Sequence, residues 1–505
     1  MAAFRSYNER NERANGVDGI MGIKTGEKYL ARIDQANPEV WLQGERLSGR
    51  LSEHPAFHGL MRTQASLYDM QVHEEYRSKL TYPCPETGEP VGLSYLQPRT
   101  KRDLARRRGM MQLWAEKHHG FLGRSPDYMN TAMMAFGESA RLFEKEYPEY
   151  ADNVKRYLKY CREQDITLSH AFIQPPSARI SSFLQSLELP AAAHVVERNA
   201  EGIVVSGAFY MTTQGVTAEE IIVFPVPLPH VSTTENPYAF VFAVPNNLEG
   251  MKFVCRENWA TMDSAYDHPL SSALDEMDTL VIFDHVQVPA DRVFLYGDPF
   301  MVNLWMKESR FHTHASHQIL CRVTAKSEFI SGVLESLIDT MGLSAYSHVT
   351  EKSAEVISIV ETLKSMLIAS EATAKKDRFG SMLPNPDILY AANFLYPRLY
   401  PRMIDILQLV GAGGLIMLPG EKDFASANGP ELETYLRTSG TDAKNKTALM
   451  RLAWEIGASS FGGRQTLYER FFFGDSTRVA SRLVEHYSLR KKHMERVAEF
   501  LKRDN

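Results

Sequence analysis

The chain has 505 residues, of which 44% are hydrophobic and 23% charged, and its formal net charge is −6 at pH 7. These values indicate an ordinary soluble globular protein with room for two or three domains, and the mixed charges give no electrostatic footprint for nucleic acid. No apolar run approaches the roughly twenty residues that a membrane helix needs, and the N-terminus has no signal-peptide pattern, so we expect a cytoplasmic protein.

The cysteines stand singly along the chain and form no C-x-x-C pair. This spacing argues against a zinc knuckle or a disulfide framework and favours a reducing compartment, so we expect no metal site. The four residues are Cys84, Cys161, Cys255 and Cys321.

Helical spacing dominates the first third of the chain. The polar segment before Thr25 is expected to be an arm, and apolar residues then recur at helical spacing over Lys101–His118. Pro126 opens a second helix and Asn153–Arg162 predicts a third. We therefore predict an N-terminal helical domain over residues 1–164.

The pattern changes near Asp165 to short β-branched and aromatic runs bounded by Pro, Gly and Asn. Such runs are typical of strands, and we predict an antiparallel β domain of sandwich or barrel type over residues 165–298. The predicted strands are Ile203–Ala208, Ile221–Phe224, Ala239–Val244 and Leu280–Phe283, and Phe283–Pro289 closes the domain.

Helical spacing returns after Asp298 and continues to the end. Long amphipathic helices must bury their apolar stripes against one another, so we predict a C-terminal helical bundle with a tail over residues 299–505. Pro397 and Pro401 lie inside one of these helices and predict a kink or a break. The predicted helices are Ser327–Met341, Ser353–Ala374, Asp387–Leu409, Thr447–Ile456 and Arg478–Leu501.

Two segments carry residues suited to chemistry. In Gly123–Tyr128, Ser125 and Pro126 predict an N-cap and a first helical position, which places Arg124 just outside a helix and Tyr128 in its first turn. In His170–Arg179, a histidine precedes a Pro-Pro break. The two segments offer a cation, a phenol and an imidazole. From spacing alone, a capped helix with a solvated arginine and a structural loop histidine is the simpler explanation.

Both segments resemble motifs of the large oxygenase component of 4-hydroxyphenylacetate 3-hydroxylase, in which Gly-Arg-Thr-Pro-Asp-Tyr and His-Ala-x-x-x-Pro-Pro-x-x-Arg flank the flavin and the phenol. Ser125 replaces the threonine of that pattern and keeps a hydroxyl. The likeness follows the order of the family and covers most of the chain. It extends to Thr25–Leu30, His54–Phe57, His268–Ser272 and Phe461–Arg464.

The resemblance implies an α+β multidomain protein of the acyl-CoA dehydrogenase-like fold, with a helical N-terminal domain, a β-barrel or sandwich and a four-helix bundle. It implies the oxygenase component of a two-component monooxygenase, a homotetramer that uses reduced FAD and O2 to convert a phenol into a catechol through a flavin hydroperoxide. The sequence has no G-x-G-x-x-G after a strand, so a separate NADH-dependent reductase is expected to supply the reduced FAD.

The resemblance also implies roles for individual residues. Arg124, Tyr128 and His170 match positions that contact the phenol. Residues matched to or suited to the cofactor are His170, Pro176, Ser177, Ala178, Arg179, Thr212, Thr213, Ser460, Phe461, Gly462 and Gly463.

Plainer explanations remain open for several of the cofactor residues. A turn is the simpler explanation of Thr213, and a helix C-cap explains Ser460–Gly463 equally well. The glycines of Gly411–Gly414 are interpreted as a helix end.

Alternative activities also fit parts of the pattern. An acyl-CoA dehydrogenase would need a catalytic glutamate such as Glu355, Glu361 or Glu371, and a 4-hydroxybutyryl-CoA dehydratase would need clustered cysteines for an iron-sulfur centre. A non-enzymatic scaffold would not bind reduced FAD. Within the monooxygenases, 4-hydroxyphenylacetate is the leading substrate, with a chlorophenol, coumarate or a carrier-bound tyrosine derivative as alternatives that the loops around Thr212–Glu220 are expected to discriminate.

Overall fold

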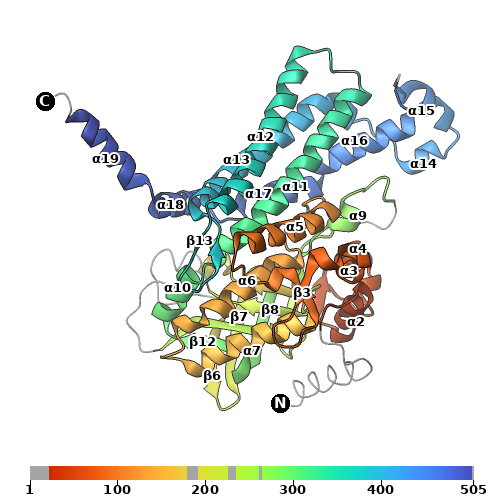
Figure 1. Cartoon of the computed structure of the whole chain (residues 1–505). Coiled ribbons are helices and arrows are strands. Elements are labelled where there is room, and N and C mark those ends of the chain that lie inside the picture. The colour runs from red at the N-terminus through yellow and green to blue at the C-terminus, as the bar shows by residue number, and fades with distance from the viewer. Residues whose placement is uncertain (1–21, 179–190, 226–234, 261–263, 439, 503–505) are drawn as a thin grey trace. The chain divides into compact units, whose positions relative to one another are not determined.

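The computed structural model describes residues 22–178, 191–225, 235–260, 264–438 and 440–502. The chain divides into two compact units (Figure 1). The first contains the residues up to Pro98 and Ala105–Gln318, and the second contains Arg99–Leu104 and the residues from Ile319 onward. The expected N-terminal arm before Thr25 lies almost wholly outside the described residues, and the three predicted domain boundaries stay a prediction.

Helices in the first unit begin where the sequence provides caps. Thr25 accepts a hydrogen bond from the Lys28 amide at the start of α2, and proline occupies the first turn of α3, α6, α7 and α10. The helices are α2 (Gly26–Ala36), α3 (Pro55–Val72), α4 (Glu74–Leu80), α5 (Lys101–Lys117, whose first residues belong to the second unit), α6 (Pro126–Ser139), α7 (Pro148–Gln164), α9 (Ser271–Leu274) and α10 (Pro299–Glu308).

Two sheets form the middle of this unit. The larger has the strand order β2-β1-β10-β11-β7-β6 and the smaller β12-β9-β8-β5, while β3 (Thr81–Pro83) and β4 (Pro90–Gly92) form a separate hairpin. The strands of the sheets are β1 (Val40–Leu42), β2 (Glu45–Arg46), β5 (Leu168–Ala171), β6 (His194–Asn199), β7 (Gly202–Thr213), β8 (Glu220–Val223), β9 (Asn236–Pro245), β10 (Met251–Cys255), β11 (Asp278–Pro289) and β12 (Val293–Gly297).

The two sheets pack face to face through phenylalanines. Phe209 of β7 meets Phe240 of β9 edge-on at 6.4 Å between ring centroids, and Phe283 of β11 meets Phe242 of β9 at 6.2 Å. These side chains belong to a buried core that also contains Tyr29 and Ile33 from α2 and Phe57 from α3. The β domain is therefore a sandwich, and of the two predicted forms the closed barrel is wrong.

The sheets are not purely antiparallel, which corrects the prediction. β1 pairs with β10 in parallel, and β5 pairs with β8 in parallel so that His170 lies opposite Ile222. Hairpin connections force neighbouring strands to be antiparallel, but β1 and β5 reach their partners through long connections that carry no such constraint. The middle sheets thus include residues from the predicted helical segment.

The second unit consists of helices and one short hairpin. The face of α13 that carries Tyr396, Tyr400 and Met403 is buried, and the helix continues through Pro397 and Pro401, so the predicted break is absent. The elements are α11 (Phe311–Thr340, whose first residues belong to the first unit), α12 (Ser347–Ala372), β13 (Lys375–Lys376), β14 (Met382–Leu383), α13 (Pro386–Gly411), α14 (Glu421–Phe424), α15 (Gly429–Leu436), α16 (Ala443–Gly457), α17 (Ser460–Phe471), α18 (Ser476–His486) and α19 (Arg490–Leu501).

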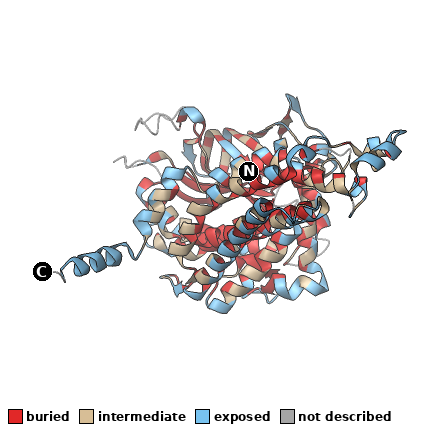
Figure 2. Ribbon diagram, turned by 90° about the horizontal axis from the view of Figure 1, so that it is seen from above, coloured by how far each residue is buried: buried red, intermediate tan, exposed pale blue. Residues whose placement is uncertain are grey.

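The C-terminal segment forms two helices where the sequence predicted one. Ser488 separates α18 from α19 and donates hydrogen bonds through its amide and its hydroxyl to the carboxylate of Asp387. No residue of α19 is buried, as the colouring near the C-terminus in Figure 2 shows. Among the described residues, no helix combines the length and apolar character of a membrane-spanning segment.

Candidate active site

The start of α6 lies where the sequence predicted, with Arg124 just outside the helix and Tyr128 in its first turn. Ser125 is the N-cap and Pro126 the first helical residue. The Ser125 hydroxyl makes no capping bond, however, because it donates to the carboxylate of Asp127, which also accepts a 3.0 Å hydrogen bond from Gln318. Complete burial raises the pKa of Asp127 above its usual value.

Three predicted side chains come together beside this turn. The Arg124 guanidinium carbon lies 4.7 Å from the centroid of the Tyr128 ring, and the Tyr128 ring lies 5.8 Å from that of His170. Tyr128 is 6% exposed and His170 is 3% exposed. A cation, a phenol and an imidazole therefore share one nearly dry site, as the motif predicted.

His170 projects from β5 among aromatic rings. Its ring is nearly parallel to those of Phe172 and Phe224, at centroid distances of 5.0 and 5.8 Å. Its Nδ1 is buried and has no hydrogen-bond partner among the described residues. Burial, with a smaller contribution from Arg124, holds the pKa of His170 well below its usual value, so the imidazole is neutral near pH 7 and has a free ring nitrogen.

An aromatic wall surrounds this group, and the sequence did not reveal most of it. Phe311 meets the Tyr128 ring edge-on at 6.3 Å and also lies 6.2 Å from Phe224 and 5.2 Å from Phe136. Phe172 lay within the quoted motif and Phe136 lies on α6 with Tyr128, but Phe224 and Phe311 come from distant segments without any spacing signal. The wall keeps the site apolar except for the three polar groups.

The end of β7 brings the predicted threonines, Thr212 and Thr213, close to β5, the strand that carries His170. Ser169, next to His170, donates a 2.7 Å hydrogen bond to the Thr213 carbonyl. The Thr213 hydroxyl is occupied, since it donates to Asp278 at 2.7 Å. The Thr212 hydroxyl oxygen is buried and has no partner among the described residues. Of the two hydroxyls, that of Thr212 is therefore the one with unused bonding capacity.

The Pro-Pro segment after β5 is only partly described. Pro176 and Ser177 are exposed and Ala178 is fully buried, whereas Arg179 lies outside the described residues. The side-chain oxygen of Gln174, just before the two prolines, is buried without a hydrogen-bond partner in the described part of the chain. It is a further buried acceptor that sequence reasoning did not identify.

In the second unit, Ser460–Gly463 form the first turn of α17, so the helix C-cap explanation is wrong. Ser459 is the N-cap and accepts a 3.1 Å hydrogen bond from the Gly462 amide. A Cβ atom on Gly462 would lie 2.5 Å from two carbonyl oxygens of α16, whereas one on Gly463 would meet nothing within 4 Å. Gly462 thus serves helix packing, and Gly463 faces open space. The Gly411–Gly414 run ends α13, as predicted.

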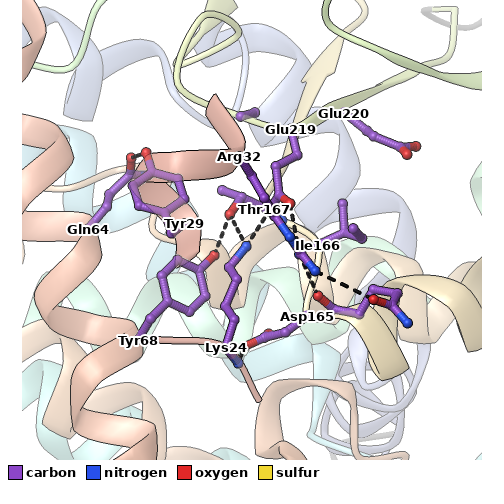
Figure 3. A network of polar contacts seen from close by, with 12 residues as sticks. Lys24, Tyr29, Arg32, Gln64, Tyr68, Asp165, Ile166, Thr167, Glu219 and Glu220 are labelled. Carbon is purple, nitrogen blue, oxygen red and sulfur yellow. Dashed lines mark hydrogen bonds and ion pairs between the residues drawn. The ribbon is translucent and has the colours of Figure 1, made fainter. Parts of the chain in front are cut away.

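A buried charged cluster anchors the opposite end of β5 (Figure 3). The Glu219 carboxylate accepts bonds from the Lys24 ammonium, from Arg32 at 3.0 Å and from the Thr167 amide at 2.7 Å. Burial alone would raise the pKa of Glu219, but the two cations lower it to about 2. This cluster holds the residue that precedes the strand of His170.

Comparison with known proteins places these features in context. The family model described as 4-hydroxyphenylacetate 3-hydroxylase N terminal matches residues 25–295, and the model of its C terminal matches residues 302–502. The chain is 40% identical over 484 residues to a probable 4-hydroxyphenylacetate 3-monooxygenase of Bacillus subtilis, covering 96% of this chain and 99% of that protein.

Two further relatives are similar over the same length. The oxygenase component of 4-hydroxyphenylacetate 3-monooxygenase of Thermus thermophilus is 41% identical, with 95% of this chain and 97% of that protein covered. A crystal structure of such an oxygenase component, complexed with FAD and 4-hydroxyphenylacetate, superposes with a TM-score of 0.90 at 40% identity and covers 95% of this chain and 99% of that one.

Proposed function

The chain belongs to the 4-hydroxyphenylacetate 3-hydroxylase family, and from this premise we propose that it is the oxygenase component of a two-component flavin monooxygenase that hydroxylates a phenol ortho to its hydroxyl group. The single observation that carries this proposal is the group of Arg124, Tyr128 and His170 inside the aromatic wall. Its leading substrate is 4-hydroxyphenylacetate, which the matched crystal structure holds together with FAD.

The polar groups of the site suit a phenol. Ortho attack becomes easier as the phenol gains phenolate character, which a fixed positive charge near its oxygen favours. Arg124 supplies that charge, Tyr128 offers a hydrogen bond through its hydroxyl, and the neutral His170 has a nitrogen able to accept the proton of the phenol. The aromatic wall excludes water from the same space.

The described residues also fit a flat heteroaromatic cofactor in the first unit. Three buried polar atoms have no hydrogen-bond partner in the described part of the chain and are thus open to a ligand: the Thr212 hydroxyl on β7, His170 Nδ1 on β5 and the Gln174 side-chain oxygen on the segment after β5. When bound, reduced FAD supplies the two electrons and the activation of O2 for the hydroxylation. Pro176–Ala178, Thr212 and Thr213 are the residues proposed to hold it there, with Arg179 matched from the motif.

The second unit contributes a separate proposed contact. The positive end of the α17 helix dipole favours an anionic group, and the open space at Gly463 in its first turn permits such a group to approach closely. Ser460, Phe461 and Gly463 are therefore proposed to bind the cofactor, whereas Gly462 acts through helix packing.

The partners follow from the same premise. An NADH-dependent reductase is proposed to supply reduced FAD, because an oxygenase component acts with a second component. A homotetramer is proposed as the assembly; the exposed apolar side chains of Met494, Val497 and Phe500 on α19 support contact with another copy.

The direct test supplies the purified protein with chemically reduced FAD, O2 and a panel of phenols that includes 4-hydroxyphenylacetate, and looks for catechols. Replacing His170 with Ala should lower hydroxylation by about 10²-fold or more and raise hydrogen peroxide release, while FAD binding stays nearly unchanged. His58→Ala is the matched control, since His58 lies on α3 outside the site, where its ring bonds to the Ser52 carbonyl. Unchanged coupling of O2 use to catechol in His170→Ala would refute the role of His170.

A further inference from the structure

A chain of buried hydrogen bonds runs from α3 to the backbone of Arg124. One carboxylate oxygen of Glu276 accepts from the Arg124 amide and from the side-chain amide of Gln214, both at 2.7 Å. The side-chain oxygen of Gln214 in turn accepts from the amide of Gln64. Gln64, Gln214 and Glu276 are each at most 2% exposed.

The chain ends on Tyr29, which lies beside Gln64 (Figure 3). The Tyr29 hydroxyl donates to the side-chain oxygen of Gln64 at 2.5 Å, with the Thr217 carbonyl 2.8 Å away. A carboxylate only accepts hydrogen bonds, so Gln214 must turn its NH2 group toward Glu276 and its side-chain oxygen toward Gln64. Gln64 must then turn its own NH2 group toward Gln214. Only one arrangement of the two side-chain amides satisfies the bonds that link Glu276, Gln214 and Gln64, and this makes the chain of bonds rigid.

Gln214 also controls the turn that follows the two threonines. Its φ of +58° lies in the left-handed region, which a residue with a side chain seldom adopts without support. Its amide donates to the Met277 carbonyl at 2.8 Å, and its carbonyl accepts from the Thr217 amide at 3.2 Å. The side-chain bonds to Gln64 and Glu276 complete this support, so the turn after Thr213 depends on them.

We propose that Gln64, Gln214 and Glu276 form a positioning relay that fixes the Arg124 backbone relative to the Thr212–Thr213 turn, and so aligns the phenol-binding cation with the cofactor side of the site. The proposal rests on the proposed function, which assigns Arg124 to the substrate and Thr212 to the cofactor. We assign these three residues to neither ligand. They act through the loops that they connect, and a misplacement of about 1 Å at a reacting centre can cost about 10²-fold in rate.

The chain contains a matched control for this relay. Gln71 lies on α3 two turns after Gln64, is fully buried and donates a 2.8 Å hydrogen bond to Asp165 instead of to Gln214. Gln64→Leu and Gln71→Leu therefore each remove one buried side-chain amide group from the same helix. Only the first variant interrupts the relay.

The experiment compares both variants with the unaltered full-length protein, using chemically reduced FAD, O2 and the best phenol of the panel. Gln64→Leu should lower the rate of hydroxylation by about tenfold and divert O2 to hydrogen peroxide, while its affinity for reduced FAD changes less than about threefold. Gln71→Leu should keep the ratio of catechol to peroxide of the unaltered protein. Equal ratios in the two variants would overturn the relay.

A second pair of variants covers the case in which Gln64→Leu does not fold. Glu276→Gln keeps the shape of the side chain and one acceptor oxygen, whereas Glu276→Ala loses the side-chain shape and every acceptor oxygen. The relay requires Glu276→Gln to regain a substantial part of the catechol yield that Glu276→Ala loses; identical yields in these two variants would contradict it. A protein without hydroxylation of any phenol would refute the proposed function itself, which separates the two failures.

Discussion

The two ends of β5 differ in how their buried polar groups are satisfied. At the start, Glu219 collects bonds from Lys24, Arg32 and the Thr167 amide, so opposite charges meet inside the protein. Near the end, the His170 nitrogen has no partner among the described residues, and the Thr212 hydroxyl across the site is in the same state. One strand thus carries a cluster that stabilises the fold and a site whose bonds await a ligand.

The largest expected effect breaks the charged cluster. Glu219→Ala leaves Lys24 and Arg32 buried without their shared carboxylate, and such a loss costs about 3–5 kcal/mol of folding free energy. Urea unfolding followed by circular dichroism measures the change. Glu53→Ala is the control, because Glu53 pairs with Arg50 at the surface and its loss should cost less than about 0.5 kcal/mol. A loss from Glu219→Ala no larger than the control would erase the contrast between the two ends of β5.

A smaller effect is expected at two neighbouring glycines of α17, which again contrast a residue that stabilises the fold with one proposed to bind a ligand. Gly462→Ala places a Cβ atom against two α16 carbonyls and should destabilise the protein by about 1–3 kcal/mol. Gly463→Ala meets open space and should be neutral or stabilise by up to about 1 kcal/mol, yet it should weaken binding of FAD. Thermal unfolding of both variants, with and without FAD, separates the change in stability from the change in FAD binding. Unaltered FAD affinity in Gly463→Ala would remove this residue from the proposed cofactor site.

The smallest effect appears in the pH dependence of stability. The pKa of His170 lies well below its usual value in the folded protein because the ring is buried near Arg124, so below about pH 6.5 the unfolded chain takes up a proton that the folded chain does not. Stability from this source is complete above about pH 6.5 and falls as the pH drops, by up to about 1.4 kcal/mol per pH unit.

His170→Phe should make that slope less steep between about pH 5 and 6.5, since a phenyl ring can pack between Phe172 and Phe224 and does not titrate. The buried His314, whose pKa also lies well below its usual value, keeps its own contribution. Glu219→Ala should leave the slope in this window unchanged. The pKa of Glu219 is about 2, so its contribution is present above its unfolded value of about 4.5 and is lost only as the pH falls from there toward 2. Unfolding curves over a pH series check both statements.

Local features of the fold were predictable from sequence. Proline and an N-cap residue mark the start of α6 by geometry that acts within a few residues, and the β-branched runs mark β7, β8, β9 and β11. The separation of α18 from α19 was not predictable, because the Tyr487–Leu489 connection contains neither Pro nor Gly and depends on a bond from Ser488 to Asp387 of another helix.

The candidate site shows the same limit. The motifs predicted Arg124 and Tyr128 at a recognisable helix start and His170 before a Pro-Pro break, whereas the strand that carries His170 was not predicted. Phe311 and Glu276 reach the site only through the tertiary fold, and no spacing in the sequence links them to Arg124. The resemblance to the family supplied the chemical roles, which the spacing alone left open.

The parallel pairing of β1 with β10 affects how the protein is made. Val40 pairs with Phe253, so the ribosome must release everything between them before this edge of the larger sheet can assemble. During that interval the newly made strand has an uncovered edge with apolar side chains, which is the kind of surface that chaperones bind. A nascent chain halted before Met251 is therefore expected to aggregate unless chaperones bind it.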